Sequence, residues 1–297
     1  MDTKQLTTFK IAAECLNFTQ TARRLNFAQS SITAQIQALE REIGCPLFER
    51  IGKRLRLTNS GHVFKGYADQ VLRLTQETES AIAGALSFPT LTIGATETQC
   101  TYRLPLVLSH YEKKYPKAGL LIKPTNYADE IKEQLIDGII DLGLIMGTKP
   151  DVRSITVKSL IDEDVWLLVS SSHPLSHTAL VSSEELREET LLLTAKGCAY
   201  RTLLERAFAQ HAISPKNMIE FVTVEAIKQC ALAGLGVAYL PAVAVRTEVE
   251  KGDLVKINWP HAPASVPTSI AWTTQRALPA NMVYFINEMQ ALYVMNR

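Results

Sequence analysis

Apolar residues near the start of the chain recur at helical spacing and predict two short helices joined by a tight turn. In each helix they repeat every three or four residues, which gathers them on one side. We expect these two sides to pack together, above an earlier helix marked by Leu6 and Phe9. The apolar residues are Phe18, Ala22 and Leu25 in the first of the two helices, and Ile32, Ile36, Leu39 and Ile43 in the second.

The opposite side of the second helix is poor in charge, which is unusual for an exposed helix. Small hydroxyl and amide groups can approach the edges of nucleobases and exchange hydrogen bonds with them. The pattern is therefore typical of a helix-turn-helix whose second helix contacts DNA. The alternative is an ordinary helical hairpin with a solvated polar side. The outward-facing residues are Ser30, Thr33, Ala34 and Gln37.

Residues 47 to 61 predict a basic β-hairpin, or wing, directly after these helices. Two short apolar runs, Leu47-Phe48 and Leu55 to Leu57, flank the turn sequence Gly52-Lys53. Residues 23 to 73 contain nine Lys or Arg and four Asp or Glu, whereas the whole chain has a formal net charge of +1. Positive charge is thus concentrated around the second helix, as expected for a segment that contacts phosphates.

This stretch resembles the DNA-binding domain of the LysR-type transcriptional regulators. The resemblance rests on LTTFKIAAECLNFTQTARRLNFAQSSITAQIQALEREIGCPLFERIGKRLRLTNSG, which matches without a gap. Ser30 stands where family members commonly have Pro, and Ala34 where they commonly have Arg. The DNA sequence that this chain recognises therefore cannot be inferred from the family. In the family, the positions of Gln29, Ser30, Thr33, Arg50, Lys53 and Arg54 touch DNA. With the outer-side residues and the arginines of the first helix, the predicted DNA-binding set is Arg23, Arg24, Gln29, Ser30, Ser31, Thr33, Ala34, Gln37, Arg50, Lys53 and Arg54.

A long helix without Pro is predicted from His62 to about Leu86, after the capping sequence Thr58 to Gly61. We predict that it dimerises, because a winged unit that reads a two-fold site needs a partner. The alternative is a helix that lies on its own domain. The family resemblance also implies a dimer, usually assembled further into a tetramer. Apolar and small residues form a heptad-like series at Phe64, Tyr67, Val71, Leu74, Thr78, Ala81 and Ala85.

The sequence predicts an N-terminal all-α winged helix-turn-helix domain (1–61), a linker helix and hinge (62–89) and a C-terminal α/β domain (90–297). In the last segment short apolar strands alternate with helices, which indicates β-α-β units and a parallel sheet. We predict two lobes on the plan of a periplasmic binding protein, as the resemblance also implies for an effector domain. Lobe I would take 90–160 and 267–297, and lobe II 161–266.

Polar residues follow several predicted strands, where ligands of open α/β sheets bind. Helix starts attract anions there, and hydroxyl groups or a nearby cation would bind a carboxylate. The alternative is that the threonines only cap helices and the arginines form salt bridges. The resemblance implies a small metabolite effector, often an organic acid. The candidate effector-binding residues are Thr96, Glu97, Thr98, Arg103, Thr125, Asn126, Gly147, Lys196, Gly197, Cys198, Tyr200 and Arg201.

Cys198 suggests a second way in which the protein would sense a signal. It lies beside Lys196 and at a predicted helix start, and both features lower the pKa of a thiol. Some LysR-type regulators are thiol sensors. However, Cys198 has no second cysteine near it in sequence. A structural or ligand-lining role is therefore preferred over a redox-sensing role.

Composition and motifs argue against several other classes of protein. Residues are 46% hydrophobic and 21% charged, as in a soluble globular protein, and no apolar run approaches membrane-spanning length. The N-terminal segment lacks an apolar signal region and the five cysteines are scattered, so we expect a cytoplasmic protein with reduced thiols. No nucleotide-binding, hydrolase or metal-ligand motif occurs, so we expect no enzymatic activity, cofactor or metal. A solute-binding protein would share the two lobes but require export.

The sequence thus predicts a sequence-specific transcriptional regulator that binds double-stranded promoter DNA and responds to a small, anionic effector. It would associate with itself as a dimer or tetramer. RNA polymerase is a further candidate partner, and no membrane contact is expected.

Overall fold

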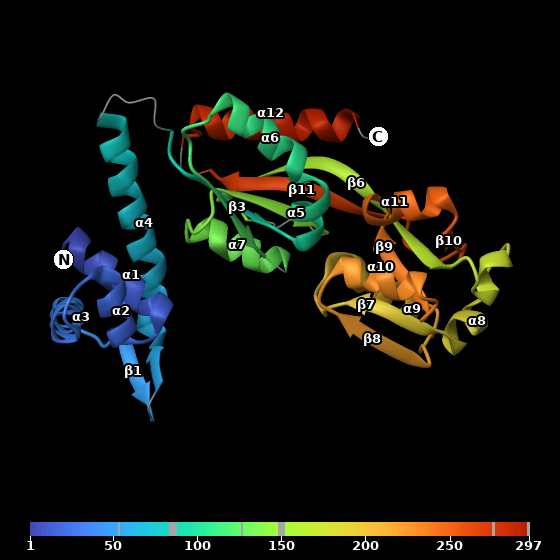
Figure 1. Ribbon diagram of the computed structural model, residues 1–297, viewed down its shortest axis with the longest axis horizontal. Coiled ribbons are helices and arrows are strands. Elements are labelled where there is room, and N and C mark those ends of the chain that lie inside the picture. Colours follow the sequence, from blue (N-terminus) through green and yellow to red (C-terminus); the bar gives the residue numbers. More distant parts are fainter. Residues whose placement is uncertain (53, 83–87, 126, 148–151, 275–276, 296–297) are drawn as a thin grey trace. The chain divides into compact units, whose positions relative to one another are not determined.

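The computed structural model describes residues 1–52, 54–82, 88–125, 127–147, 152–274 and 277–295 (Figure 1). The chain forms two compact units, Met1–Pro89 with Ile136–Ile139, and Thr90–Leu135 with Ile140–Arg297. Three parts of the sequence-based predictions lie outside the described residues: Lys53 of the wing, Asn126 of the effector-binding set and the stretch 83–87 of the hinge.

The first unit contains the helices and the hairpin that the sequence predicts. Asn17 caps the second helix, because its side-chain oxygen accepts hydrogen bonds from the amides of Thr19 and Gln20. Asn26 ends that helix in the left-handed conformation with φ 55°, which produces the tight turn into the third. The elements are α1 (Thr3–Cys15), α2 (Phe18–Leu25), α3 (Gln29–Ile43), β1 (Phe48–Ile51), β2 (Arg54–Leu57) and α4 (Asn59–Ile82).

The apolar sides of α1, α2 and α3 meet in one core, as predicted. Ile32, Ile36 and Leu39 of α3 are at most 2% exposed. The ring of Phe9 lies 5.4 Å from that of Phe48, which joins the wing to the helical core. The burial of an entire side of α3 fixes its rotation, so that its polar side must face outward.

The long helix α4 differs from the predicted seam at one position. The ring of Phe64 packs edge-on against Phe9 at 4.8 Å, so Phe64 belongs to the core of its own unit. The exposed apolar side of α4 is instead formed by Val63, Tyr67, Val71 and Leu74, with 63, 63, 42 and 54% of their surface exposed. The part of the prediction that covers Ala85 lies outside the described residues.

The second unit is built around a nine-stranded sheet in the order β4-β3-β5-β11-β6-β9-β7-β8, with β10 paired to β6. Its strands are β3 (Leu91–Ala95), β4 (Leu120–Pro124), β5 (Leu142–Met146), β6 (Ile155–Ser170), β7 (Thr190–Thr194), β8 (Asn217–Phe221), β9 (Val237–Pro241), β10 (Leu254–Lys256) and β11 (Ser265–Thr273). Its helices are α5 (Glu97–Tyr102), α6 (Leu104–Lys114), α7 (Ala128–Ile136), η1 (Pro174–His177), α8 (Ser183–Glu188), α9 (Ala199–Gln210), α10 (Val224–Leu232), α11 (Ala242–Lys251) and α12 (Ala280–Met295).

Two separate apolar cores divide this unit into the two lobes that the sequence predicts. In lobe I, β3 pairs parallel with β4 and β5, and in lobe II β7 pairs parallel with β8 and β9. The long antiparallel strands β6 and β11 run through both lobes and join them (Figure 1). The expected α/β architecture, with two chain crossings between the lobes, is confirmed.

The strands that join the lobes are longer than predicted, and three helices of this unit, α5, α8 and α11, were not predicted. The first ten residues of β6, ITVKSLIDED, are mostly exposed or part-exposed and lack the continuous apolar run that marks the last six residues, VWLLVS, as a strand in sequence. The helices α5 and α8 have only six residues each, too few for a helical period to show in the sequence, and α11 begins directly after the last residue of β9. Among the described residues, no helix is long and apolar enough to cross a membrane.

Candidate functional site

The polar side of α3 is open to solvent. Ala28 precedes α3 without a side-chain cap, so the first amides of the helix remain available for a phosphate group. Thr33 Oγ1 accepts a hydrogen bond from Gln29 Nε2 at 3.0 Å, which orders two of the polar groups on this surface. The predicted contact residues Gln29, Ser30, Ala34 and Gln37 are exposed, and Ser31 and Thr33 are partly exposed.

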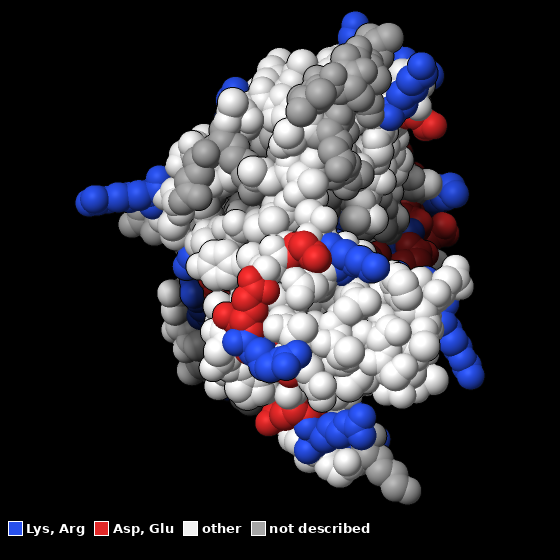
Figure 2. Space-filling view, turned by 90° about the vertical axis from the view of Figure 1, so that its left-hand side faces the viewer, with Lys and Arg blue, Asp and Glu red and all other residues white. Residues whose placement is uncertain are grey.

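Arginines of the wing and of α2 surround this surface. Arg50 of β1, Arg54 of β2 and Arg23 of α2 are exposed, and none forms an ion pair with another described residue. Arg24 differs, because its guanidinium lies 2.8 Å from the carboxylate of Glu14. In the lower part of Figure 2, blue side chains lie among red ones, beside a broad uncharged surface. Exposed cations without carboxylate partners are suited to bind phosphates.

A cavity of about 640 Å³ lies between the two lobes of the second unit. The carboxyl ends of strands from both lobes open onto it, where ligands of α/β sheets bind. It therefore has the position expected of a small-molecule site. The predicted residues that line it are Thr96, Glu97, Thr98, Thr125, Gly147, Gly197, Cys198 and Tyr200.

Two buried hydroxyl groups in this cavity lack a partner among the described residues. Thr125 follows β4 in lobe I and is 1% exposed, and Thr194 ends β7 in lobe II and is 8% exposed. A buried hydroxyl without a hydrogen bond is destabilising unless a ligand or water satisfies it. By contrast, Thr98 Oγ1 already lies 3.3 Å from the hydroxyl of Tyr200 across the cavity. Burial, and next the neighbouring Cys198, raises the pKa of Tyr200, so its hydroxyl stays protonated.

Glycines allow the lobes to approach closely at the cavity. Gly147 of lobe I has φ +92°, and a Cβ there would lie 3.0 Å from that of Ala199 in lobe II. Gly197 has φ +90°, and a Cβ would lie 2.6 Å from the ring of Tyr127. Other residues would be strained by the positive φ and would clash at these places. The two glycines thus allow the start of α9 to lie against lobe I. Cys198 is the residue before α9, and its side chain accepts no hydrogen bond from the first amides of the helix.

Two domain models match the chain over almost its whole length. The bacterial regulatory helix-turn-helix protein, lysR family, matches residues 3–62, and the LysR substrate binding domain matches residues 85–293. The chain belongs to the LysR family of transcriptional regulators. It is a DNA-binding regulator with an effector-binding domain and not an enzyme, as the sequence predicts.

Known proteins resemble this LysR regulator over almost the whole chain. It is 43% identical to the uncharacterized HTH-type transcriptional regulator YwqM of Bacillus subtilis (strain 168), over 97% of this chain and 98% of that one. Full-length OxyR from Pseudomonas aeruginosa has a TM-score of 0.72 at 25% identity, with 98 and 95% of the two chains covered. Full-length CbnR complexed with its target DNA has a TM-score of 0.69 at 25% identity, with 98 and 99% covered.

Two arginines of the LysR regulator lie outside the cavity that they were predicted to line. Arg103 binds both carboxylate oxygens of Glu163, because its Nε donates to Oε2 at 3.0 Å and its Nη2 donates to Oε1 at 2.5 Å. Arg201 is 5% exposed and pairs with Glu205 at 2.7 Å and with Glu220 at 2.6 Å. Both guanidiniums are therefore satisfied inside the protein, and the prediction that they contact the ligand is corrected. Lys196 is exposed and is not part of the cavity wall either.

Sequence reasoning missed several residues of the cavity wall. Thr194 ends a predicted strand, and Tyr127, Asp129 and Lys132 begin the helix after another, so the rule of strand carboxyl ends would have found them. Val222 directly follows β8, so the same rule would have found it, whereas Arg206 and Pro267 also line the cavity but had no comparable local signal. The charged wall residues are thus Glu97, Asp129, Lys132 and Arg206.

Proposed function

We propose that this regulator reads promoter DNA with the polar side of α3 while the wing arginines contact phosphates. The observation that carries the proposal is the exposed, weakly charged side of α3 together with Arg23, Arg50 and Arg54, which are exposed and pair with no carboxylate among the described residues. The hydroxyl and amide groups there suit base edges, and the guanidiniums suit the backbone. The same proposal includes DNA contacts by Ser30, Ser31, Ala34, Gln37 and Lys53. It also includes the division of the chain into the domain 1–61, the linker 62–89 and the domain 90–297.

We further propose that α4 pairs two chains on a pseudo-palindromic site. Val63, Tyr67, Val71 and Leu74 form an exposed apolar side along the helix. Such a continuous apolar stripe is costly in water and is typical of a helix–helix interface. Replacing Tyr67 by Glu should therefore give a monomer in sedimentation experiments, whereas Lys65→Glu on the same helix should leave the assembly unchanged.

The cavity is proposed to bind a small organic anion that changes how the regulator acts on DNA. The support consists of the hydroxyls of Thr125 and Thr194, which have no partner in the part of the chain that the structure describes, the uncapped start of α9 and the cations Lys132 and Arg206. Hydroxyls and helix amides together bind carboxylates well, and the cations add a favourable charge. The ligand can shift the equilibrium between two arrangements of the lobes only to the extent that it binds one arrangement more tightly than the other.

The experiment is a thermal-shift screen of organic acids against the full chain, followed by gel shifts on promoter DNA with each stabilising compound. A specific effector should raise the unfolding temperature and change the mobility or affinity of the DNA complex. The variant Thr125→Val/Thr194→Val should lose the thermal shift but still bind DNA. If no organic acid stabilises the protein, or if this variant responds normally, the proposed ligand site is wrong.

A thiol-based signal through Cys198 is the second candidate. One observation favours it: Cys198 is partly buried, free and in the cavity wall at the start of α9. No second described cysteine lines the cavity, so a sensing reaction would have to stop at one sulfur. The test compares the DNA affinity of the wild type and of Cys198→Ser before and after peroxide treatment. If Cys198 senses oxidation, only the wild type should change its DNA affinity.

A further inference from the structure

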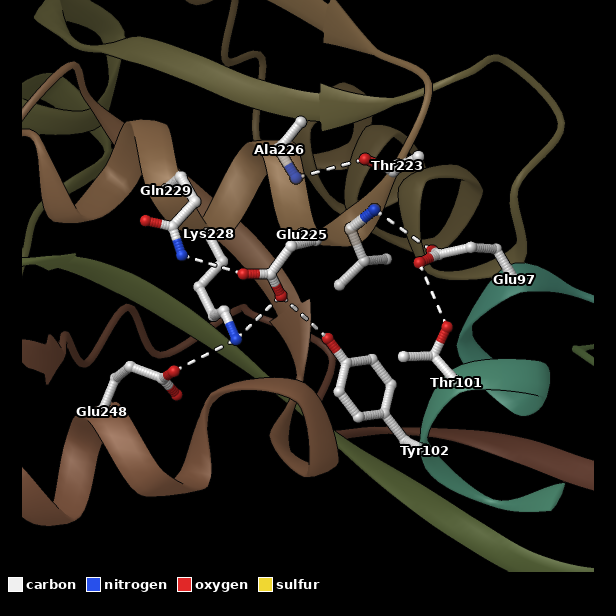
Figure 3. Close-up of polar contacts among 10 residues, drawn as sticks. Glu97, Thr101, Tyr102, Thr223, Glu225, Ala226, Lys228, Gln229 and Glu248 are labelled. Atoms are coloured by element: carbon white, nitrogen blue, oxygen red, sulfur yellow. Dashed lines mark hydrogen bonds and ion pairs between the residues drawn. The ribbon is translucent and has the colours of Figure 1, made fainter. Parts of the chain in front are cut away.

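The short helix α5 connects the two lobes through its side chains. Glu97, Thr98 and Tyr102 all lie on α5 in lobe I, and each forms a hydrogen bond with lobe II. Thr98 shares a hydrogen bond with Tyr200. Glu97 accepts a hydrogen bond from the first residue of α10, and Tyr102 donates one to the second (Figure 3). One helix thus carries three of the polar contacts that cross between the lobes.

The carboxylate of Glu97 occupies the amino end of α10. The amide of Val224, the first residue of α10, donates to Glu97 Oε2 at 3.2 Å. A first-turn amide has no acceptor inside its own helix, and this end of a helix attracts negative charge. Thr223 caps the amide of Ala226 at 3.2 Å and leaves that of Val224 to Glu97. Glu97 and Val224 both line the cavity.

The second contact of α5 is supported by an ion-pair network in lobe II. Tyr102 donates its hydroxyl to Glu225 Oε2 at 3.2 Å. The ammonium of Lys228 lies 2.8 Å from Glu225 and 3.0 Å from Glu248, and the Lys228 side chain is only 10% exposed. The hydrogen bond from Lys228 lowers the pKa of Glu225, and burial raises that of Tyr102 to about 12. At neutral pH the carboxylate is therefore ionised and the phenol protonated, as this bond requires.

We propose that α5 is a latch between the lobes and that Glu97 competes with an anionic effector for the amino end of α10. The proposal rests on the proposed small-molecule function of the cavity and concerns its regulation. A ligand carboxylate that reaches Val224 must displace the carboxylate of Glu97, and the lobes then lose one of the bonds that connect them. Effector binding and release of the latch are therefore coupled, because the effector and Glu97 compete for the same backbone amide, that of Val224.

The latch is tested by hydrogen–deuterium exchange of the full chain without DNA or effector. In Glu97→Ala, the amides at the start of α10 should exchange about tenfold faster than in the wild type, because a charge-assisted hydrogen bond is lost. Glu97→Gln should show a smaller increase, since its amide oxygen still accepts a hydrogen bond. Glu184→Ala is the matched control, because Glu184 is an exposed acid in the first turn of α8. Equal exchange in wild type and Glu97→Ala would overturn the proposal.

Competition is tested with acetate as the probe, against sodium chloride at equal ionic strength. Acetate should slow exchange at the start of α10 in Glu97→Ala and leave the wild type unchanged, because the wild-type position is already filled by a carboxylate. An identical effect of acetate on both proteins would refute the competition. If Glu97→Ala does not fold, Glu97→Gln and Tyr102→Phe carry the exchange test. A missing effector response in gel shifts would sink the proposed function but would leave this exchange result standing.

Discussion

The arginines predicted to contact DNA in the first unit and the two predicted to contact a ligand in the second unit differ in how they are neutralised. Arg23, Arg50 and Arg54 are exposed and have no carboxylate partner in the described chain. In the second unit, Arg103 and Arg201 are enclosed by Glu163, Glu205 and Glu220. An unpaired exposed cation is available to a ligand, whereas a buried pair is part of the fold. In the proposed function, exposed charges of the first unit therefore bind DNA, and mainly hydroxyls and helix ends of the second unit bind the ligand.

The largest effect is expected from the buried pair. The Arg103 and Glu163 side chains are 12 and 3% exposed, so Arg103→Ala would leave a buried carboxylate without a partner. The free energy of unfolding should fall by about 3–5 kcal/mol. Chemical unfolding followed by tryptophan fluorescence measures this, because Trp166, Trp259 and Trp272 all belong to the second unit.

Two control variants sharpen this measurement. Adding Glu163→Gln to Arg103→Ala should recover part of the loss, since the buried charge is then removed. Arg206→Ala, at an exposed arginine of the second unit, should change stability by less than about 0.5 kcal/mol. If Arg103→Ala were as mild as Arg206→Ala, the division between structural and available arginines would fail.

The next effect concerns the wing. The double variant Arg50→Ala/Arg54→Ala should weaken DNA binding about tenfold and reduce the slope of log K against log salt by roughly 2, about 0.9 per lost phosphate contact. Fluorescence anisotropy on promoter DNA at several salt concentrations measures both quantities. Arg24→Ala should have a smaller effect because Glu14 already pairs with Arg24. Lys113→Ala, an exposed lysine of α6 in the second unit, serves as the control. An unchanged slope in the double variant would contradict the wing assignment.

A smaller effect is expected at Thr33 on the polar side of α3. Thr33→Val keeps the shape of the side chain and removes the hydroxyl, so base preference should shift by about 1 kcal/mol at one position of the site. Selection from randomised DNA measures the preference. Thr7→Val is the matched control, because Thr7 also donates its hydroxyl to a backbone carbonyl one helical turn earlier, within α1. If both variants select the same sequence as the wild type, α3 does not read bases at Thr33.

The sequence predicted the surface of the first unit better than the cavity of the second, for a physical reason. The helical period of Ile32, Ile36 and Leu39 fixes which side of α3 is buried, and the outer side follows without any tertiary information. The cavity depends on which side chains pair across the fold. In sequence, a threonine and an arginine that follow a strand look equally suited to bind a ligand. In the structure, Arg201 pairs with Glu220, nineteen residues later, whereas the hydroxyl of Thr194 has no partner among the described residues.

The same limit explains the remaining differences. The rule that ligands bind at strand ends identified Thr96, Thr98 and Thr125 correctly as cavity-wall residues. It could not show that Glu97 would bond the amide of Val224, because that contact joins residues of different lobes. Phe64 fitted a heptad seam by spacing, yet the ring of Phe9 draws it into the core. Spacing alone does not reveal whether an apolar residue such as Phe64 packs into the core of its own unit or against a partner helix.

The smallest expected change in stability tests the cavity most directly. Thr194→Val and Thr125→Val each remove a buried hydroxyl that lacks a partner in the described chain, so without ligand the free energy of unfolding should stay the same within about 0.5 kcal/mol or rise. Tyr239→Phe, also buried in the second unit, removes a hydroxyl that donates to the carbonyl of Pro263 at 2.6 Å, and should cost about 1 kcal/mol. Tryptophan fluorescence reports all three variants. If the threonine variants lose as much stability as Tyr239→Phe, their hydroxyls are satisfied inside the protein, and the cavity loses the groups proposed to bind its ligand.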